Sequence, residues 1–193
     1  MSVLETELKL ASFEEVARGR RSVRTFDPEW RISKEEMTEL LELAVRAPSS
    51  SNLQPWRFLV IDDPELKRKL LPIAFNQQQV ADASAVIAVL SDVEGWRNAE
   101  EIYNQSYEAG YMTKETAVSF AERSAKGYSS LPPDAAAAVA YTDGGLVSMQ
   151  LMLAARAKGY DTVPMGGYDK AKFAEAFGIE PRYLPVMLIA IGK

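Results

Sequence analysis

A long apolar helix is the feature that most constrains the fold of this chain. The segment from Pro132 to Lys158 opens on Pro-Pro-Asp, which is typical of a helix start, and it is followed by Gly159, which favours a helix end. Its large apolar side chains fall on several faces of the expected helix: Val139, Leu146, Val147, Met149, Leu151, Met152 and Leu153. A helix that is apolar on more than one face must be covered on more than one side. The sequence therefore predicts one central, buried helix around which other elements pack.

Shorter elements are expected on both sides of this helix in the sequence. Ser12 and Ser33 each stand three residues before a glutamate, a capping box that predicts helices over 13–18 and 34–46, the second followed by Pro48. Pro64 and Gly178 delimit two further helices, over 64–75 and 169–177. Apolar runs predict four strands, over 57–61, 83–90, 160–165 and 184–191. The second run is continuous, which indicates a strand buried on both faces.

Between the second strand and the long helix, the composition changes to charged and aromatic residues. This segment, about 92–131, predicts a helical excursion from the core, with helices around 95–109 and 113–127 that end at Gly110 and Gly127. Its aromatic side chains are expected to pack in the core or at an interface between protomers.

Composition excludes several classes of protein. The 193 residues are 47% apolar and 25% charged, which is ordinary for one globular domain spanning 1–193. No apolar run approaches the roughly 18 residues of a membrane span, and Met1 to Glu7 lack the pattern of a secretory signal, so we expect a cytoplasmic protein with no membrane partner. A net charge of −5 without a long basic run disfavours nucleic acid as a partner.

The chain contains no cysteine and no histidine. This removes disulfides, thiolate nucleophiles, the commonest general base and the usual zinc ligands, so we expect no metal site. Any chemistry is therefore expected to belong to a cofactor.

Two polar clusters offer the groups that a flavin mononucleotide needs. Arg20, Arg21 and Arg24 carry planar guanidinium groups, which meet phosphate oxygens in charge-assisted hydrogen bonds. The run from Pro48 to Gln54 supplies hydroxyls and amides, which can both donate to and accept from a ribityl chain and a pyrimidine edge. Each alone has a plainer interpretation, since arginines are often solvated and short polar residues are common in turns.

In order and spacing, these two clusters resemble the nitroreductase family. Two further segments agree with the resemblance, 75–84 ahead of one strand and 163–169 after another, and the similarity runs from about Phe13 to Gly192. The family consists of homodimeric FMN enzymes that take hydride from NAD(P)H and pass it to nitroaromatics, quinones or related electrophiles. The resemblance implies an α+β fold, with a mainly antiparallel sheet of about four strands flanked by helices, in an intertwined homodimer with two FMN sites at its interface.

The resemblance also implies which residues contact FMN. One protomer supplies the phosphate and ribityl contacts, the ring-edge amides and the turn beside the ring: Arg20, Arg21, Ser22, Arg24, Asn76, Gln79, Pro164, Met165, Gly166 and Gly167. Its partner supplies a loop that crosses the flavin: Pro48, Ser49, Ser50, Asn52 and Gln54. No side chain is implied as catalytic, because hydride passes through flavin N5, at which the backbone N–H of Gly166 points.

Two positions depart from the family pattern. Relatives often carry lysine at the position of Gln79 and glutamate at that of Gly166. An amide brings no positive charge to the reduced ring, so we expect a lowered reduction potential, and the glycine leaves the substrate side more open. Relatives also continue into a basic tail that reaches the phosphate, and whether Lys193 supplies this contact stays open.

The implied activity is reduction of a flat, electron-poor small molecule by a ping-pong mechanism. Two alternatives remain open at this point. One is a branch of the family with other flavin chemistry, such as reductive dehalogenation or flavin breakdown. The other is a flavin-binding protein without enzymatic activity. The sequence does not choose between NADH and NADPH, or between one- and two-electron transfer.

Overall fold

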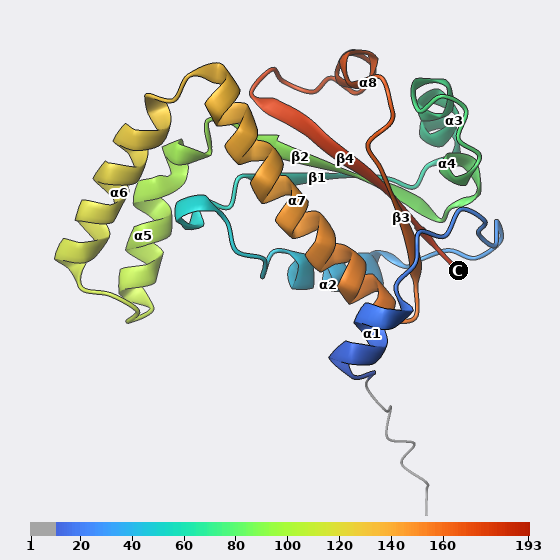
Figure 1. The fold of residues 1–193 in the computed structure, drawn as a ribbon, viewed down its shortest axis with the longest axis horizontal. Coiled ribbons are helices and arrows are strands. Elements are labelled where there is room, and N and C mark those ends of the chain that lie inside the picture. The colour runs from blue at the N-terminus through green and yellow to red at the C-terminus, as the bar shows by residue number, and fades with distance from the viewer. Residues whose placement is uncertain (1–10) are drawn as a thin grey trace, which may run out of the picture.

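A single antiparallel sheet lies at the centre of the computed structural model, which describes residues 11–193 (Figure 1). Its strands are β1 (Trp56–Ile61), β2 (Ala85–Asp92), β3 (Asp161–Met165) and β4 (Tyr183–Gly192), in the order β1-β2-β4-β3. All three neighbouring pairs are antiparallel. The predicted α+β fold with a mainly antiparallel sheet is therefore confirmed.

Alternation along the central strands divides the core into two layers. All eight residues of β2 are buried, as the continuous apolar run predicted. Ile87 and Val89 belong to the core on one side of the sheet, while Val86 and Ala88 belong to the core on the other. Helices must therefore cover both faces.

The helices are distributed over these two faces. On one face, α2 (Lys34–Ala44) and α7 (Pro133–Ala157) pack on the sheet, and α1 (Phe13–Gly19) contacts the end of α7. On the other lie α3 (Pro64–Ile73), α4 (Gln79–Asp82) and α8 (Lys170–Phe177) (Figure 1). Both predicted capping boxes are present, although α2 ends at Ala44, earlier than expected. The left-handed Gly178 ends α8 as predicted.

The long helix α7 crosses one face of the sheet, as the sequence predicted for a central helix (Figure 1). At Gly144 it comes so close to β4 that an added Cβ would lie 2.6 Å from Cγ2 of Val186. Its other side carries Tyr141, Leu146 and Met149, each more than 40% exposed. The helix is thus apolar on two faces, and the described part of the protomer covers only one of them.

The excursion consists of α5 (Ala99–Glu108) and α6 (Lys114–Ser129), which pack on each other around Tyr103, Ala117 and Ala121. A short 3-10 helix, Gly95–Asn98, precedes α5. Gly110 has a φ of 78° and ends the first helix as predicted. The prediction that Gly127 ends the second helix is wrong, because α6 continues to Ser129. Gly127 is exposed and does not adopt the left-handed conformation, so it stays in the last turn at only a modest cost.

Candidate functional site

The arginine-rich segment leaves α1 and runs beside strand β3. Ser22 forms a parallel bridge with Thr162, and the N–H of Val23 donates to the carbonyl of Thr162 at 3.1 Å. Behind the segment, Gly19 lies against Arg156, whose Nη1 is 2.9 Å from Oδ1 of Asp161. The segment is thereby fixed to β3 and to the end of α7.

The three arginines of this segment differ in what they contact. Arg21 folds back, and its Nη1 donates to the carbonyls of Arg18 and Arg20, the latter at 2.8 Å. Arg20 and Arg24 form no ion pair with any carboxylate of residues 11–193, and Arg24 and Ser22 are exposed. Two guanidinium groups and a hydroxyl are therefore available for a ligand.

Strand β3 ends in an open turn. Pro164 and Met165 are its last residues, and Gly166 and Gly167 follow, both exposed. Neither glycine has a positive φ, so the backbone of this turn does not itself require glycine. What glycine does provide is space, because an added Cβ at either position would meet nothing within 4 Å. A flat group can therefore approach this backbone.

Gln77 connects this turn to the amide-rich segment after α3. Its Nε2 donates to the carbonyl of Gly167 at 2.9 Å and to that of Ala74 at 3.0 Å. Its Oε1 accepts from Nε2 of Gln79 at 3.0 Å, and the same Nε2 is 3.5 Å from Sδ of Met165. The structure thus brings Gln79 and its neighbours next to the glycine turn.

A buried lysine of α3 holds the end of the amide-rich segment in place. Lys67 in α3 is buried, and its ammonium donates to the carbonyl of Ala81 at 3.1 Å and of Ala83 at 2.6 Å. Burial lowers the pKa of Lys67. Since the two carbonyls lie at the end of α4, Lys67 fixes the short helix that begins with Gln79. Asn76, by contrast, is exposed and has a φ of 56°.

The loop from Pro48 to Gln54 is held in an unusual conformation. Ser51, Asn52 and Gln54 have φ values of 48°, 52° and 48°, in the left-handed region that side chains disfavour. Such strain persists only where surrounding contacts enforce it, and it is frequent at functional sites. The N–H of Gln54 donates to Oγ of Ser49 at 2.9 Å.

A buried aspartate anchors this loop to α7. Oδ1 of Asp143 accepts from both the N–H and the Oγ of Ser50, each at 2.9 Å, and Asp143 is only 1% exposed. Asp143 was not predicted as a site residue. A lone carboxylate in an apolar stretch of a buried helix was the signal that could have found it, because such a group needs a partner.

The structure brings some of the predicted residues together and leaves others apart. The arginine segment, the glycine turn and the amide segment all adjoin β3. The serine-containing loop does not, because it is fixed at Asp143, whereas the arginine segment is fixed near Arg156. These two positions lie thirteen residues apart on one straight helix, a distance of about 20 Å along its axis.

Tyr168, just after the glycine turn, was also not predicted. Its ring packs edge-on against Phe173, and its hydroxyl is buried without a hydrogen-bond partner among the described residues. Burial raises the pKa of Tyr168 well above its usual value. An unpartnered buried hydroxyl this close to the turn is a polar group that a bound molecule or water can satisfy.

Lys193 lies elsewhere, between two aromatic rings. Its Nζ is 5.1 Å from the ring centre of Trp30 and 5.8 Å from that of Tyr160. The Tyr160 hydroxyl donates to Glu36 at 2.6 Å. This hydrogen bond, together with those from the backbone and side chain of Ser33, lowers the pKa of Glu36 to about 2. Burial and the same bond to Glu36 raise the pKa of Tyr160 to about 12.

Comparisons with known proteins agree with this arrangement. The family model described as "Nitroreductase family" matches residues 17–193. A Bacillus subtilis protein named "Putative NAD(P)H nitroreductase YdgI" is 54% identical over 188 residues, covering 96% of this chain and 90% of its own. The chain belongs to the nitroreductase family. The resemblance seen in the sequence is therefore confirmed, and with it the expectation that the protein is an oxidoreductase.

Solved structures of the nitroreductase family share the fold. A crystal structure from Exiguobacterium sibiricum, in complex with FMN, has a TM-score of 0.90 at 52% identity and covers 95% of this chain and 88% of its own. The enone reductase CLA-ER has a TM-score of 0.84 at 38% identity, covering 94% and 88%. A protein of Lactiplantibacillus plantarum named "CLA biosynthesis enone reductase" is 39% identical over 178 residues, covering 91% of this chain and 82% of its own.

Two further features of residues 11–193 concern membrane-spanning helices and clusters of metal-binding side chains. Among these residues no helix combines the length and apolar character that crossing a membrane requires. The same residues contain no group of three or more acidic side chains placed to hold a metal ion.

Proposed function

We propose that this protein is an FMN-dependent oxidoreductase that takes hydride from NAD(P)H and reduces flat, electron-poor small molecules by a ping-pong mechanism. The observation that carries the proposal is the meeting of three segments along β3: free guanidinium groups, an open glycine turn and a row of amides. These match the phosphate, the ring face and the ring edge of one flavin mononucleotide. The names of the relatives and the FMN complex support the same cofactor and electron donor.

The residues present offer a chemically suitable group for each part of FMN. Arg20 and Arg24 would hold its phosphate, with Ser22 at the ribityl chain. Asn76 and Gln79 would face the edge of the ring, and the N–H of Gly166 would point at N5. The open space at Gly166 and Gly167 leaves room for the ring and for a second flat molecule stacked on it. When bound, FMN supplies the reversible acceptance of hydride from NAD(P)H.

The remaining predicted contacts come, in this proposal, from the partner protomer. Pro48, Ser49, Ser50, Asn52 and Gln54 are held apart from the arginine segment of their own chain, which supports a site built from two chains. The exposed apolar face of α7 at Tyr141, Leu146 and Met149 supports a homodimer that buries it. Residues 1–193 would then form one flavin-binding domain with the α5–α6 excursion projecting from it. The cytoplasmic location stays a prediction from the sequence.

Mixed dimers test the two-chain site. We expect Arg24→Ala and Asn52→Ala each to lose FMN as homodimers. In a mixed dimer, one site receives both changes and the other receives neither, so random exchange of equal amounts restores about a quarter of the sites. If each site belonged to a single chain, mixing would restore no activity.

Steady-state kinetics test the reaction itself. A ping-pong mechanism gives parallel double-reciprocal plots when NADH or NADPH is varied at several acceptor concentrations. Intersecting lines would contradict it.

A second class of acceptor is favoured by a specific observation. Because an enone reductase is among the relatives at 39% identity, the C=C bond of an α,β-unsaturated ketone is the second candidate acceptor. Comparing kcat/KM for a quinone, a nitroaromatic and an enone with the same donor decides between them.

A further inference from the structure

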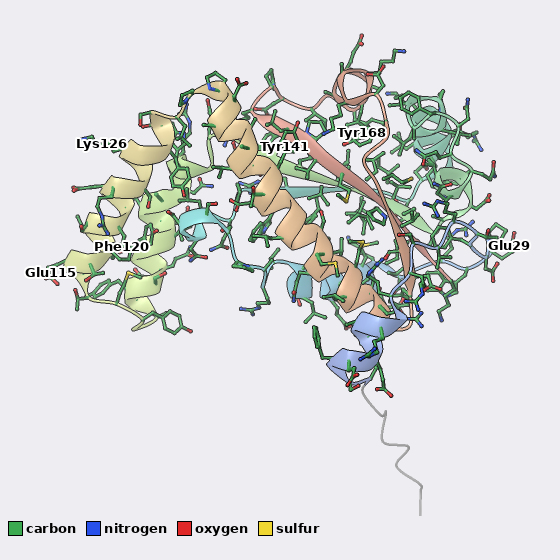
Figure 2. All side chains as sticks on the ribbon, in the orientation of Figure 1. Glu29, Glu115, Phe120, Lys126, Tyr141 and Tyr168 are labelled. Atoms are coloured by element: carbon green, nitrogen blue, oxygen red, sulfur yellow. The ribbon has the colours of Figure 1, made fainter. Side chains whose placement is uncertain are left out.

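A polar hollow lies beside the strained loop, on the side of the α5–α6 excursion. It has a volume of about 380 Å³ and is lined by Ser51, Tyr103, Phe120, Arg123, Ser124 and Tyr128. Phe120 lies where α6 faces α5, edge-on to Tyr103 with ring centres 5.7 Å apart (Figure 2). None of these residues belongs to the predicted FMN contacts, yet Ser51 stands between two of them in the chain. The hollow therefore adjoins the proposed flavin site without being part of it.

Among the hydroxyl groups that line the hollow, one hydrogen is not used in a hydrogen bond to another group of the hollow. The Tyr103 hydroxyl donates to the carbonyl of Ser51 at 2.7 Å and lies 3.3 Å from Oγ of Ser124, which must then supply the hydrogen of that contact. Ser51 and Tyr128 share one hydrogen bond at 3.1 Å, for which one hydrogen suffices. One of these last two hydroxyls can therefore donate to a bound molecule.

Arg123 adds a positive charge to the same hollow. Its guanidinium lies over the ring of Phe120, 4.7 Å from the centre, and it pairs with no carboxylate among residues 11–193. Its N–H groups also donate to no other group of the described chain. The hollow thus has hydrogen-bond donors in excess and a guanidinium without a carboxylate partner, and an acceptor with negative charge satisfies both.

We propose that this hollow binds an anionic oxygen group carried by a ligand of the flavin site, with Arg123 as the residue that selects it. The inference rests on the proposed function, because the loop through Ser51 is what places the hollow beside the flavin. Two ligands of the reaction carry such a group: an aromatic acceptor with a carboxylate, and NADPH with its additional phosphate. In either case Arg123 discriminates between ligands that differ by one negative charge.

Binding measurements on the FMN-loaded protein test this directly. The variant is Arg123→Gln, and the matched control is Lys126→Gln, which removes a charge from the same helix one turn away and outside the hollow (Figure 2). The probes are 4-nitrobenzoate against the neutral 4-nitrobenzamide, and NADP⁺ against NAD⁺, with dissociation constants from calorimetry. We expect Arg123→Gln to weaken one anionic probe about fivefold, the size of one solvent-exposed ion pair. Its neutral or less charged counterpart should change less than twofold.

The outcomes separate the two sources of the anion. Loss for 4-nitrobenzoate alone assigns the hollow to the acceptor, and loss for NADP⁺ alone assigns it to the donor. Equal effects of Arg123→Gln and Lys126→Gln on every probe, or no binding of either anionic probe to the wild type, overturn the proposal. Bleaching of the flavin by NAD(P)H in Arg123→Gln is recorded separately, so that failure of the proposed reaction is not mistaken for failure of the hollow.

Discussion

Removing the anchor of the strained loop should cost both stability and cofactor affinity. In Asp143→Ala, Ser50 loses two hydrogen bonds to a carboxylate, each 2.9 Å long and largely shielded from water. Hydrogen bonds to a charged group contribute about 1.5–3 kcal/mol each. Because the variant also removes a carboxylate that is costly to bury, the lower value is the better guide, and we expect a loss of about 3 kcal/mol in the free energy of unfolding.

The effect on FMN follows from the strain in the same loop. Without Asp143, Ser51 and Asn52 have less to hold them at φ values of 48° and 52°, and each such residue stores roughly 1–3 kcal/mol. If FMN binding must re-form the loop at the lower value for both residues, about 2 kcal/mol in all, its dissociation constant rises about thirtyfold. The matched control is Asp143→Asn, whose side-chain oxygen can still accept both bonds, and we expect it to stay within about tenfold of the wild type.

Two assays measure these quantities. Urea unfolding followed by circular dichroism gives the stability, and quenching of free FMN fluorescence during titration gives the dissociation constant. The reasoning is refuted if folded Asp143→Ala binds FMN within twofold of the wild type. It is also refuted if Asp143→Asn is as impaired as Asp143→Ala, since the charge and not the hydrogen bonds would then matter.

Three further changes probe other parts of the account. Gln79→Lys should raise the flavin midpoint potential, on the order of tens of millivolts, because it places a cation beside the negative charge that reduction puts on the ring; a redox titration that shows no rise contradicts this. Gly144→Ala should destabilise the fold by about 1–3 kcal/mol, because its Cβ would lie 2.6 Å from Val186. In Gly145→Ala the added Cβ meets nothing within 4 Å, so the free energy of unfolding of the protomer should not fall. Equal stabilities of the two variants in urea unfolding would contradict the packing argument. Glu36 has a pKa lowered from 4.5 to about 2, so its contribution is complete above pH 4.5 and is lost as the pH falls through 2. Stability measured from pH 6 to 2 should therefore fall less steeply in Glu36→Gln than in the wild type, and equal slopes would count against the Tyr160 bond.

Local sequence patterns predicted which helices and strands form better than they predicted where each one ends. The capping boxes at Ser12 and Ser33 are present because each satisfies amides of its own helix start, without help from distant residues. Gly127 misled because glycine ends a helix only when the chain turns left-handed there, which depends on the packing of the residues after it. The strand order β1-β2-β4-β3 rests on pairings between distant segments, which no local pattern specifies.

The candidate site likewise contains residues that local sequence revealed and residues that only the fold revealed. The segments around Arg20 and Gly166 were found because their chemistry is carried by residue type, and the structure places the first beside β3 and the second directly after it. Asp143 was missed because its partner, Ser50, is 93 residues away in the sequence. Gln77 was missed because it stands among three consecutive glutamines, and only the fold shows which of them reaches the carbonyl of Gly167.

The most direct test of the central claim is the visible absorption spectrum of the purified protein, followed without oxygen as NADH and then NADPH are added. The account predicts the bands of oxidised flavin in the protein loaded with FMN, and their loss on addition of at least one donor, with the faster donor identifying the physiological one. Bands that persist with both donors would contradict the reductase function. Failure of added FMN to bind at all would contradict the site itself.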